Sequence, residues 1–194
     1  ITDTHYFENS LGAEGPEYDR FNLTEQKCLA ETGSIIDSAF DTLCADKEVQ
    51  TVLIPGDLIF DGEKESHLGF IKKLEKLTAC GKRIYVTTAG HDYNDNPRAF
   101  KGEERIPVEG TSREELLTLY KDYGYSDCLA FNERTYSYAA SIADGVRLLA
   151  LNCDGDGKHF HGFDEEHLKW IKEQIDSAKA AGDIFFAMTH YPVL

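Results

Sequence analysis

Short runs of β-branched and apolar residues alternate along this chain with longer segments in which apolar residues recur every three or four positions. The short runs predict buried strands, and the longer segments predict helices that pack by one face. We expect strands at residues 51–54, 83–88, 136–140, 146–151 and 184–188, with residues 1–5 forming the end of another. Strands that alternate with helices are typical of a layered α/β fold.

Capping residues place the helices between these strands. Thr24 is a candidate N-cap, Ser112 and Glu115 have the spacing of a capping box, and Asp164 precedes the last helical segment. The predicted helices cover residues 24–44, 68–80, 112–124 and 164–182. Residues 93–110 are rich in Asn, Asp, Pro and Gly, so we expect a loop there.

The length of the chain indicates how many domains it forms, and its charge limits the kinds of molecule that it can bind. A chain of 194 residues fits one domain, which we expect to span residues 1–194. It has 35 acidic and 20 basic residues and a formal net charge of −15. Nucleic-acid affinity comes mostly from Lys and Arg that neutralise phosphates, so we expect no binding to long nucleic acids or anionic membranes. No apolar run approaches the ~18 residues of a membrane span. The oligomeric state is left open.

The five cysteines are an odd number at wide spacings and include no C-x-x-C pair. Cys28, Cys44 and Cys80 fall on or at the end of apolar helical stripes, where a free thiol behaves as a small hydrophobe. We therefore interpret the cysteines as structural thiols and expect no disulfide framework. That composition suits a reducing compartment, although the location, cytoplasmic or exported, is left open.

Four polar clusters follow predicted strands. They are Asp3-Thr4-His5, Gly56-Asp57 with Asp61-Gly62, Gly90-His91-Asp92, and His190-Tyr191-Pro192. Loops at the carboxyl ends of neighbouring strands meet at one edge of an α/β sheet, so these side chains are expected to converge. Carboxylates and imidazoles suit Zn, Mn or Fe. Each cluster alone is also compatible with a turn, a capping pair or an interior histidine; the combination indicates a metal site.

These segments, together with Leu58-Ile59-Phe60, resemble the successive motifs of the calcineurin-like metallophosphoesterases, and residues 56–67 are similar to a bacterial branch of that family. The resemblance implies a double-layered β-sandwich flanked by helices (αββα) and two divalent or trivalent metal ions (Mn, Fe or Zn). It implies that Asp3, His5 and Asp57 bind the first metal, and that Asp57 bridges to a second, which His190 also binds.

The same resemblance implies hydrolysis of a small phosphate ester by a hydroxide that bridges the metals. His91 is expected to assist the leaving group, and Asp92 to orient His91. Monoesters, diesters, nucleotides and lipid head groups all remain open as substrates.

Two departures from the family pattern are visible. Gly90 stands where the family has an asparagine that binds the second metal, and Asn94 or Asp95 are candidates to replace it. A later Gly-His-x-His motif is absent, so we expect a domain that is incomplete at its C-terminus and a chain truncated at both ends. We interpret His159-x-His161 as part of a solvated loop, in preference to a metal site. We likewise interpret Asp154-Gly155-Asp156-Gly157 as a turn.

The alternative function is a degenerate family member that acts as a binding or regulatory module; an unrelated α/β domain is a remoter alternative.

Overall fold

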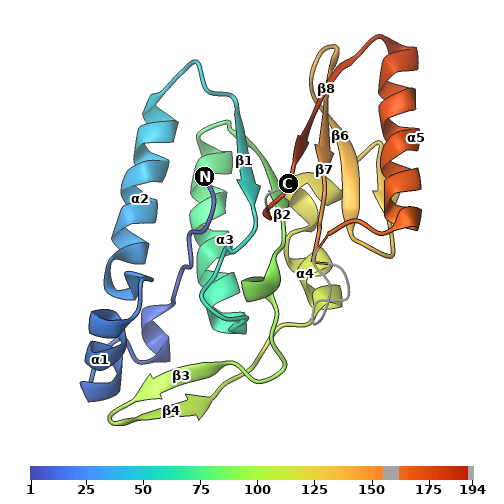
Figure 1. Cartoon of the computed structure of the whole chain (residues 1–194). Coiled ribbons are helices and arrows are strands. Elements are labelled where there is room, and N and C mark those ends of the chain that lie inside the picture. Colours follow the sequence, from blue (N-terminus) through green and yellow to red (C-terminus); the bar gives the residue numbers. More distant parts are fainter. Residues whose placement is uncertain (155–161, 192–194) are drawn as a thin grey trace.

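The computed structural model describes residues 1–154 and 162–191. Two sheets pack face to face between helices, so the αββα sandwich expected from the sequence is confirmed (Figure 1). The outer helices on one side are α2 (Leu29–Ala45) and α3 (Lys64–Ala79), and α5 (Glu165–Ala181) covers the other side. The strands are β1 (Thr51–Pro55) and β2 (Arg83–Thr87) in one sheet, and β5 (Ala130–Asn132), β6 (Ser137–Ala143), β7 (Val146–Ala150) and β8 (Ile184–Met188) in the other.

The first sheet pairs β1 with β2 in parallel, with Val52 opposite Ile84. The second has the order β5-β6-β7-β8, antiparallel except for the parallel β7–β8 pair. Because side chains alternate along a strand, Ile54 of β1 faces the helices, whereas Leu53 faces the second sheet. Both faces of β1 are therefore covered, which explains why its sequence is apolar throughout.

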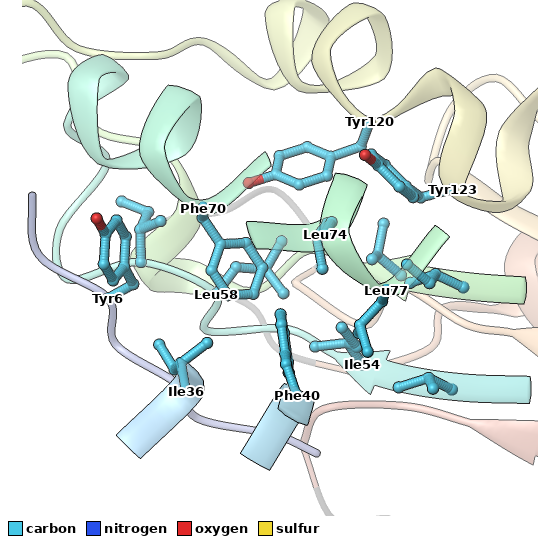
Figure 2. Packing of buried hydrophobic residues seen from close by; sticks show 14 of the residues in the cluster. Tyr6, Ile36, Phe40, Ile54, Leu58, Phe70, Leu74, Leu77, Tyr120 and Tyr123 are labelled. Carbon is cyan, nitrogen blue, oxygen red and sulfur yellow. The ribbon is translucent and has the colours of Figure 1, made fainter. Parts of the chain in front are cut away.

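The largest core lies between the first sheet and its helices (Figure 2). Phe40 of α2 and Phe70, Leu74 and Leu77 of α3 are fully buried against Ile54 of β1. These residues recur at helical spacing in the sequence, so the predicted helical stripes are the faces that form this core. The core fixes the position of β1 and thereby of the loop that follows it.

Hydrogen bonds join the two sheets across the sandwich. The Tyr138 hydroxyl of β6 donates to the Val86 carbonyl of β2 at 2.8 Å, in the buried interior. The Tyr85 hydroxyl of β2 donates in return to the Ser141 carbonyl of β6 at 3.2 Å, at an exposed position. The sheets are thus held in one relative orientation by directional bonds as well as by apolar contact.

Capping residues mark the helix ends largely as expected. The Ser112 side chain accepts from the Glu115 amide at the start of α4 (Arg113–Leu119), and the Asp164 side chain accepts from the His167 amide at the start of α5. Helix α4 ends earlier than expected and is followed by the irregular turn η3 (Lys121–Tyr125). No helix in the described part of the chain is long and apolar enough to cross a bilayer.

The segment 93–110 was expected to be a loop, and this is wrong in part. It contains a hairpin of β3 (Arg98–Lys101) and β4 (Glu104–Pro107). Phe100 of this hairpin packs against Phe7, Tyr18 and Phe21, which come from the N-terminal region. The hairpin is therefore stabilised by aromatic contacts with a distant segment, and its local composition carries no sign of them.

The N-terminal region also differs from expectation. Residues 1–5 run alongside the end of β1 and the loop after it and form no strand; the first bridge is Tyr6 with Ile59. A short turn η1 (Asn9–Leu11) and helix α1 (Pro16–Thr24) follow, so Thr24 ends a helix instead of beginning one. Pro16 at the first helical turn and the acidic Glu17 and Asp19 explain why α1 starts there.

The interpretation of Cys44 and Cys80 as unpaired thiols is wrong, because a disulfide joins them. The two residues are 36 positions apart in sequence, but they lie at the C-terminal ends of α2 and α3, which pack side by side. Helix packing brings the two sulfur atoms together, and cysteine spacing alone could not predict it. Cys28, Cys128 and Cys153 are free.

Candidate metal centre

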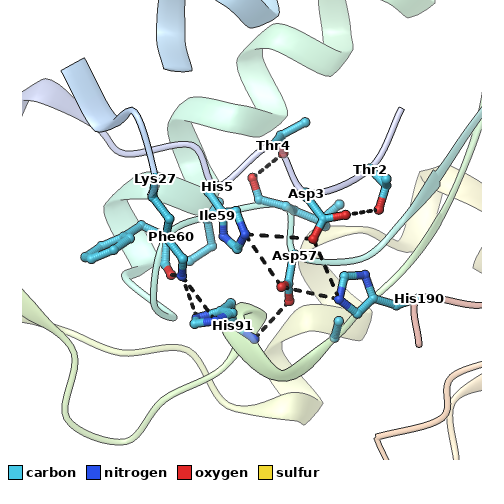
Figure 3. Close-up of polar contacts among 12 residues, drawn as sticks. Thr2, Asp3, Thr4, His5, Lys27, Asp57, Ile59, Phe60, His91 and His190 are labelled. Carbon is cyan, nitrogen blue, oxygen red and sulfur yellow. Dashed lines mark hydrogen bonds and ion pairs between the residues drawn. The ribbon is translucent and has the colours of Figure 1, made fainter. Parts of the chain in front are cut away.

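Three loops at strand ends and the N-terminal segment carry the predicted site residues to one place (Figure 3). Asp57 follows β1 directly, η2 (Gly90–Asp92) follows β2, and His190 follows β8. Asp3 and His5 lie on the N-terminal segment, where their amides donate to the carbonyls of Gly56 at 3.4 Å and Asp57 at 3.1 Å. The convergence expected from the sequence is thus present for Asp3, His5, Asp57 and His190.

The backbone at this place adopts an unusual conformation. Asp3, His5 and Asp57 have positive φ angles of 53°, 40° and 50°, and Tyr136 is the fourth non-glycine residue of this kind in the described part of the chain. Side chains other than glycine disfavour this region, at a cost of order 1 kcal/mol or more per residue. Such strain persists where surrounding structure imposes it, and here it is concentrated at three of the four convergent residues.

Asp57 lies between two imidazoles. Its Oδ2 is 3.3 Å from His190 Nε2 and 3.7 Å from His5 Nε2. Asp3 Oδ1 is 4.0 Å from His190 Nε2 and 3.9 Å from His5 Nε2. Candidate ligand atoms of Asp3, Asp57 and His190 all lie within 4.8 Å of one another. Two carboxylates are therefore flanked by one imidazole on each side.

The orientation of His190 is set by a hydrogen bond on its far nitrogen. His190 Nδ1 donates to the Pro55 carbonyl at 2.8 Å, so Nε2 is directed at the two carboxylates. Burial alone would lower the pKa of His190, but the hydrogen bond and charge of Asp57 outweigh it and raise the pKa to about 9. Correspondingly, the contact with His190 outweighs the burial of Asp57 and lowers the pKa of that carboxyl. A cation that binds here replaces a proton on His190.

His5 has the opposite electrostatic character. Burial, followed by the nearby positive charge of Lys27, lowers the pKa of His5 to about 4, so its ring is neutral at pH 7. His5 Nδ1 is buried and has no hydrogen-bond partner among the residues that the structure describes. A neutral imidazole beside two carboxylates is ready to act as a metal ligand without losing a proton.

This donor set fits a metal ion. Ligands that lie about 2.0–2.2 Å from one ion lie roughly 3–3.5 Å or more from each other, which is close to the spacing of these oxygen and nitrogen atoms. Two carboxylates and two imidazoles are ligands for Zn, Mn or Fe. The hydrogen bond from His190 Nδ1 to a carbonyl is the kind of support that orients metal-binding histidines.

His91 lies at the edge of this centre, with its ring 5.1 Å from that of His5. The His91 amide donates to Asp57 Oδ1 at 3.2 Å, and its Nδ1 is 3.8 Å from Asp61 Oδ1. The His91 side chain is 42% exposed, so an imidazole next to the ligand cluster is open to a substrate.

Asp92 is fully buried and does not touch the His91 ring. Its carboxylate accepts from the backbone amides of Leu58, Ile59 and Ala89, at 2.7, 3.3 and 2.8 Å. These bonds tie the loop after β1 to the turn that carries His91. Asp92 thus positions the backbone of both loops.

The position of the missing family asparagine is next to Tyr191. A Cβ added to Gly90 would lie 3.0 Å from the Tyr191 hydroxyl, its one neighbour within 4 Å in the described part of the chain besides the adjoining residues. Asn94 directs its side-chain oxygen to the Asn96 amide at 2.9 Å, so it forms a local turn. Pro192, His159, His161 and the Gly155–Gly157 part of the acidic turn lie outside the described residues.

Sequence reasoning missed two groups of residues around the site. Lys27 reaches His91, but a single lysine in a polar segment carries no signal of that contact. His67 and Tyr120 are buried behind Asp92. The position of His67 on the apolar face of its helix, one turn before Phe70, could have shown that it is buried.

Comparisons with known proteins agree with this geometry. The family model described as calcineurin-like phosphoesterase matches residues 1–194. A crystal structure of a dimetal phosphatase from Danio rerio is similar to this chain with a TM-score of 0.64 and 16% sequence identity, over 100% of this chain and 69% of the other. At this identity the likeness supports the fold. No curated protein matches the sequence.

Proposed function

Because the chain belongs to the calcineurin-like phosphoesterase family, whose members are metal-dependent phosphoesterases, we propose that it hydrolyses a small phosphate ester with metal ions held by Asp3, His5, Asp57 and His190. The observation that carries the proposal is the convergence of these four side chains. They come from three distant parts of the chain, and each of the two carboxylates has an oxygen 3.3–4.0 Å from Nε2 of each of the two histidines.

Bound cations supply Lewis-acid polarisation of a phosphoryl oxygen and lower the pKa of water. In the proposed arrangement Asp3, His5 and Asp57 would hold one ion, and Asp57 and His190 would hold the second. Asp57 suits the shared role because its carboxylate lies between the two histidines. The ions are Mn, Fe or Zn, for which this mixture of oxygen and nitrogen donors is suitable.

His91 acts on the substrate side of the proposed site. Its amide is fixed to Asp57, so the backbone position is set, while its half-exposed ring faces the region where a phosphate would bind. From there an imidazole can donate a proton to the leaving oxygen. Asp92 supports this role indirectly by holding η2 against the loop after β1.

A binding or regulatory module is the second candidate function. It is favoured by Gly90, which has no side chain to bind a second ion, although Tyr191 lies beside it. A module of this kind would bind phosphate or metal through the same four residues and would not turn over an ester.

Substitution of Asp57 tests the proposal, because this residue touches both histidines. We expect Asp57→Asn to weaken Mn²⁺ binding about 100-fold or more and to abolish measurable hydrolysis of p-nitrophenyl phosphate. Metal content by mass spectrometry and calorimetry, together with steady-state turnover, are the measurements. Asp37→Asn is the matched control, since Asp37 pairs with Lys73 away from the site.

The outcomes separate the two functions. Unchanged metal affinity in Asp57→Asn contradicts the metal site itself. A wild-type protein that binds metal through Asp57 but hydrolyses no phosphate ester supports the binding module.

A further inference from the structure

Lys27 projects from the segment between α1 and α2 toward the candidate site (Figure 3). Its ammonium lies 3.1 Å from His91 Nε2 and 3.2 Å from His91 Nδ1. On its other side the ammonium approaches the Phe60 carbonyl at 3.5 Å and lies 5.1 Å from the centre of the Phe60 ring. A single positive charge is thus held directly against the imidazole on the substrate side.

This cation lacks a direct anionic partner. Lys27 is half-buried, yet within residues 1–154 and 162–191 no carboxylate oxygen lies at ion-pair distance from its ammonium. Burial lowers the pKa of Lys27, and the more distant charges of Asp57, Asp61 and Glu63 only partly oppose this. A partly desolvated charge of this kind is stabilised when an anion binds beside it.

There is space beside this lysine. Lys27 lines a hollow of about 540 Å³ together with Asp3 and His5, between the N-terminal segment and α2, whereas His91, Asp57 and His190 do not line it. A ligand in this hollow can contact Lys27 and the proposed metal ligands Asp3 and His5.

We propose that Lys27 binds a terminal phosphoryl oxygen of the substrate and makes the site selective for phosphate monoesters over diesters. The proposal rests on the proposed function, because it specifies the substrate class of that site. A monoester carries about 1.5–2 negative charges at pH 7, whereas a diester carries only one and has one terminal oxygen fewer. An extra fixed cation next to His91 therefore stabilises the monoester more.

Lys27→Met removes the charge while it keeps an unbranched apolar stem, and Lys27→Arg keeps the charge. With Mn²⁺-loaded protein we expect Lys27→Met to weaken orthophosphate binding in calorimetry about 10- to 100-fold, as for loss of a charged hydrogen bond. The ratio of kcat/KM for p-nitrophenyl phosphate to that for bis-p-nitrophenyl phosphate should fall by a similar factor. Lys27→Arg should stay within about threefold of wild type in both measurements.

The matched control is Lys73→Met. Lys73 is also a half-buried lysine over an aromatic ring, 5.2 Å from the centre of Tyr6, but it pairs with Asp37. Orthophosphate affinity and the ester ratio should be unchanged in this variant. Melting temperature and Mn²⁺ content verify that each variant is folded and loaded, and Lys27→Gln replaces Lys27→Met if the latter does not fold.

The inference is overturned if Lys27→Met binds orthophosphate as wild type does, or if Lys27→Arg loses as much affinity as Lys27→Met. Failure of the proposed function has a different signature, since wild type would then hydrolyse neither ester. In that case the orthophosphate titration still decides whether Lys27 binds phosphate.

Discussion

At the scale of single residues, Gly90 and Tyr191 are a spatial pair. The family asparagine would project from position 90 into the space where the Tyr191 hydroxyl lies, 3.0 Å from an added Cβ. A side chain at position 90 and the hydroxyl of Tyr191 would therefore compete for the same space. A substitution at one of the two positions changes the room available at the other.

We predict that Gly90→Asn alone changes Mn²⁺ affinity by less than about threefold, because its amide must displace the Tyr191 hydroxyl. In the double variant with Tyr191→Phe the hydroxyl is gone, and an added oxygen ligand should raise the affinity about tenfold or more. Calorimetric Mn²⁺ titration of wild type, both single variants and the double variant measures this. Equal gains in Gly90→Asn and in the double variant would contradict the pairing.

At the scale of elements, His67 connects α3 with the turn that carries His91. Its Nε2 lies 2.7 Å from the Asp92 carbonyl, which can only accept, so Nε2 carries the hydrogen. Nδ1 of the neutral ring then accepts from the Tyr120 hydroxyl, also at 2.7 Å. The position of η2 is thus determined by a helix that lies behind it, away from the metal ligands.

The burial of His67 predicts a pH dependence of stability. Burial lowers the pKa of His67 from 6.5 to about 4, so the unfolded chain takes up a proton more readily than the folded chain. The contribution of the neutral His67 ring to the free energy of unfolding is fully present above pH 6.5. It is lost as the pH falls through 4, by up to about 3 kcal/mol. Urea unfolding of the metal-free protein at pH 7.5 and pH 4.5 measures it.

The comparison with His67→Gln isolates this residue, because other groups, His5 among them, also titrate in that range. The glutamine variant should be less stable at pH 7.5 but should lose less stability on acidification. An identical loss in wild type and variant would show that His67 does not control the acid response.

At the scale of the whole molecule, the two sheets are joined by the reciprocal tyrosines of β2 and β6. Tyr138 is fully buried, and its hydroxyl also occupies the space beside Gly124, where an added Cβ would lie 2.3 Å from it. Gly124 has a φ of 115°, a conformation that favours glycine, so a larger residue here would be strained. The relative position of the sheets decides whether His190, after β8, reaches Asp57, after β1.

We predict that Tyr138→Phe lowers the free energy of unfolding by about 1–2 kcal/mol, because the Val86 carbonyl loses a buried donor. Tyr85→Phe is the matched control: it breaks the exposed bond to Ser141, and water replaces the hydroxyl at a cost below about 0.5 kcal/mol. Urea denaturation compares the two. A smaller effect in Tyr138→Phe than in Tyr85→Phe would contradict the role of the buried bond.

The sequence by itself determined the alternation of strands and helices, the capping of α4 and α5, and the polar residues at the ends of β1, β2 and β8. These features follow from the local periodicity of apolar residues and from the residue types at caps and turns. Because strand ends in a layered α/β fold gather at one edge, the approach of Asp57, His91 and His190 to each other followed from those local patterns.

Only the tertiary structure decided the hairpin of β3 and β4, the Cys44–Cys80 disulfide and the contact of Lys27 with His91. The disulfide and the contact of Lys27 with His91 join segments that are distant in sequence, and the hairpin, whose own strands are neighbours in sequence, packs against distant aromatic residues. Their stabilisation comes from contacts with other parts of the chain, namely an aromatic cluster, a pair of packed helices and an imidazole on another loop. Such contacts exist only after the layers have assembled.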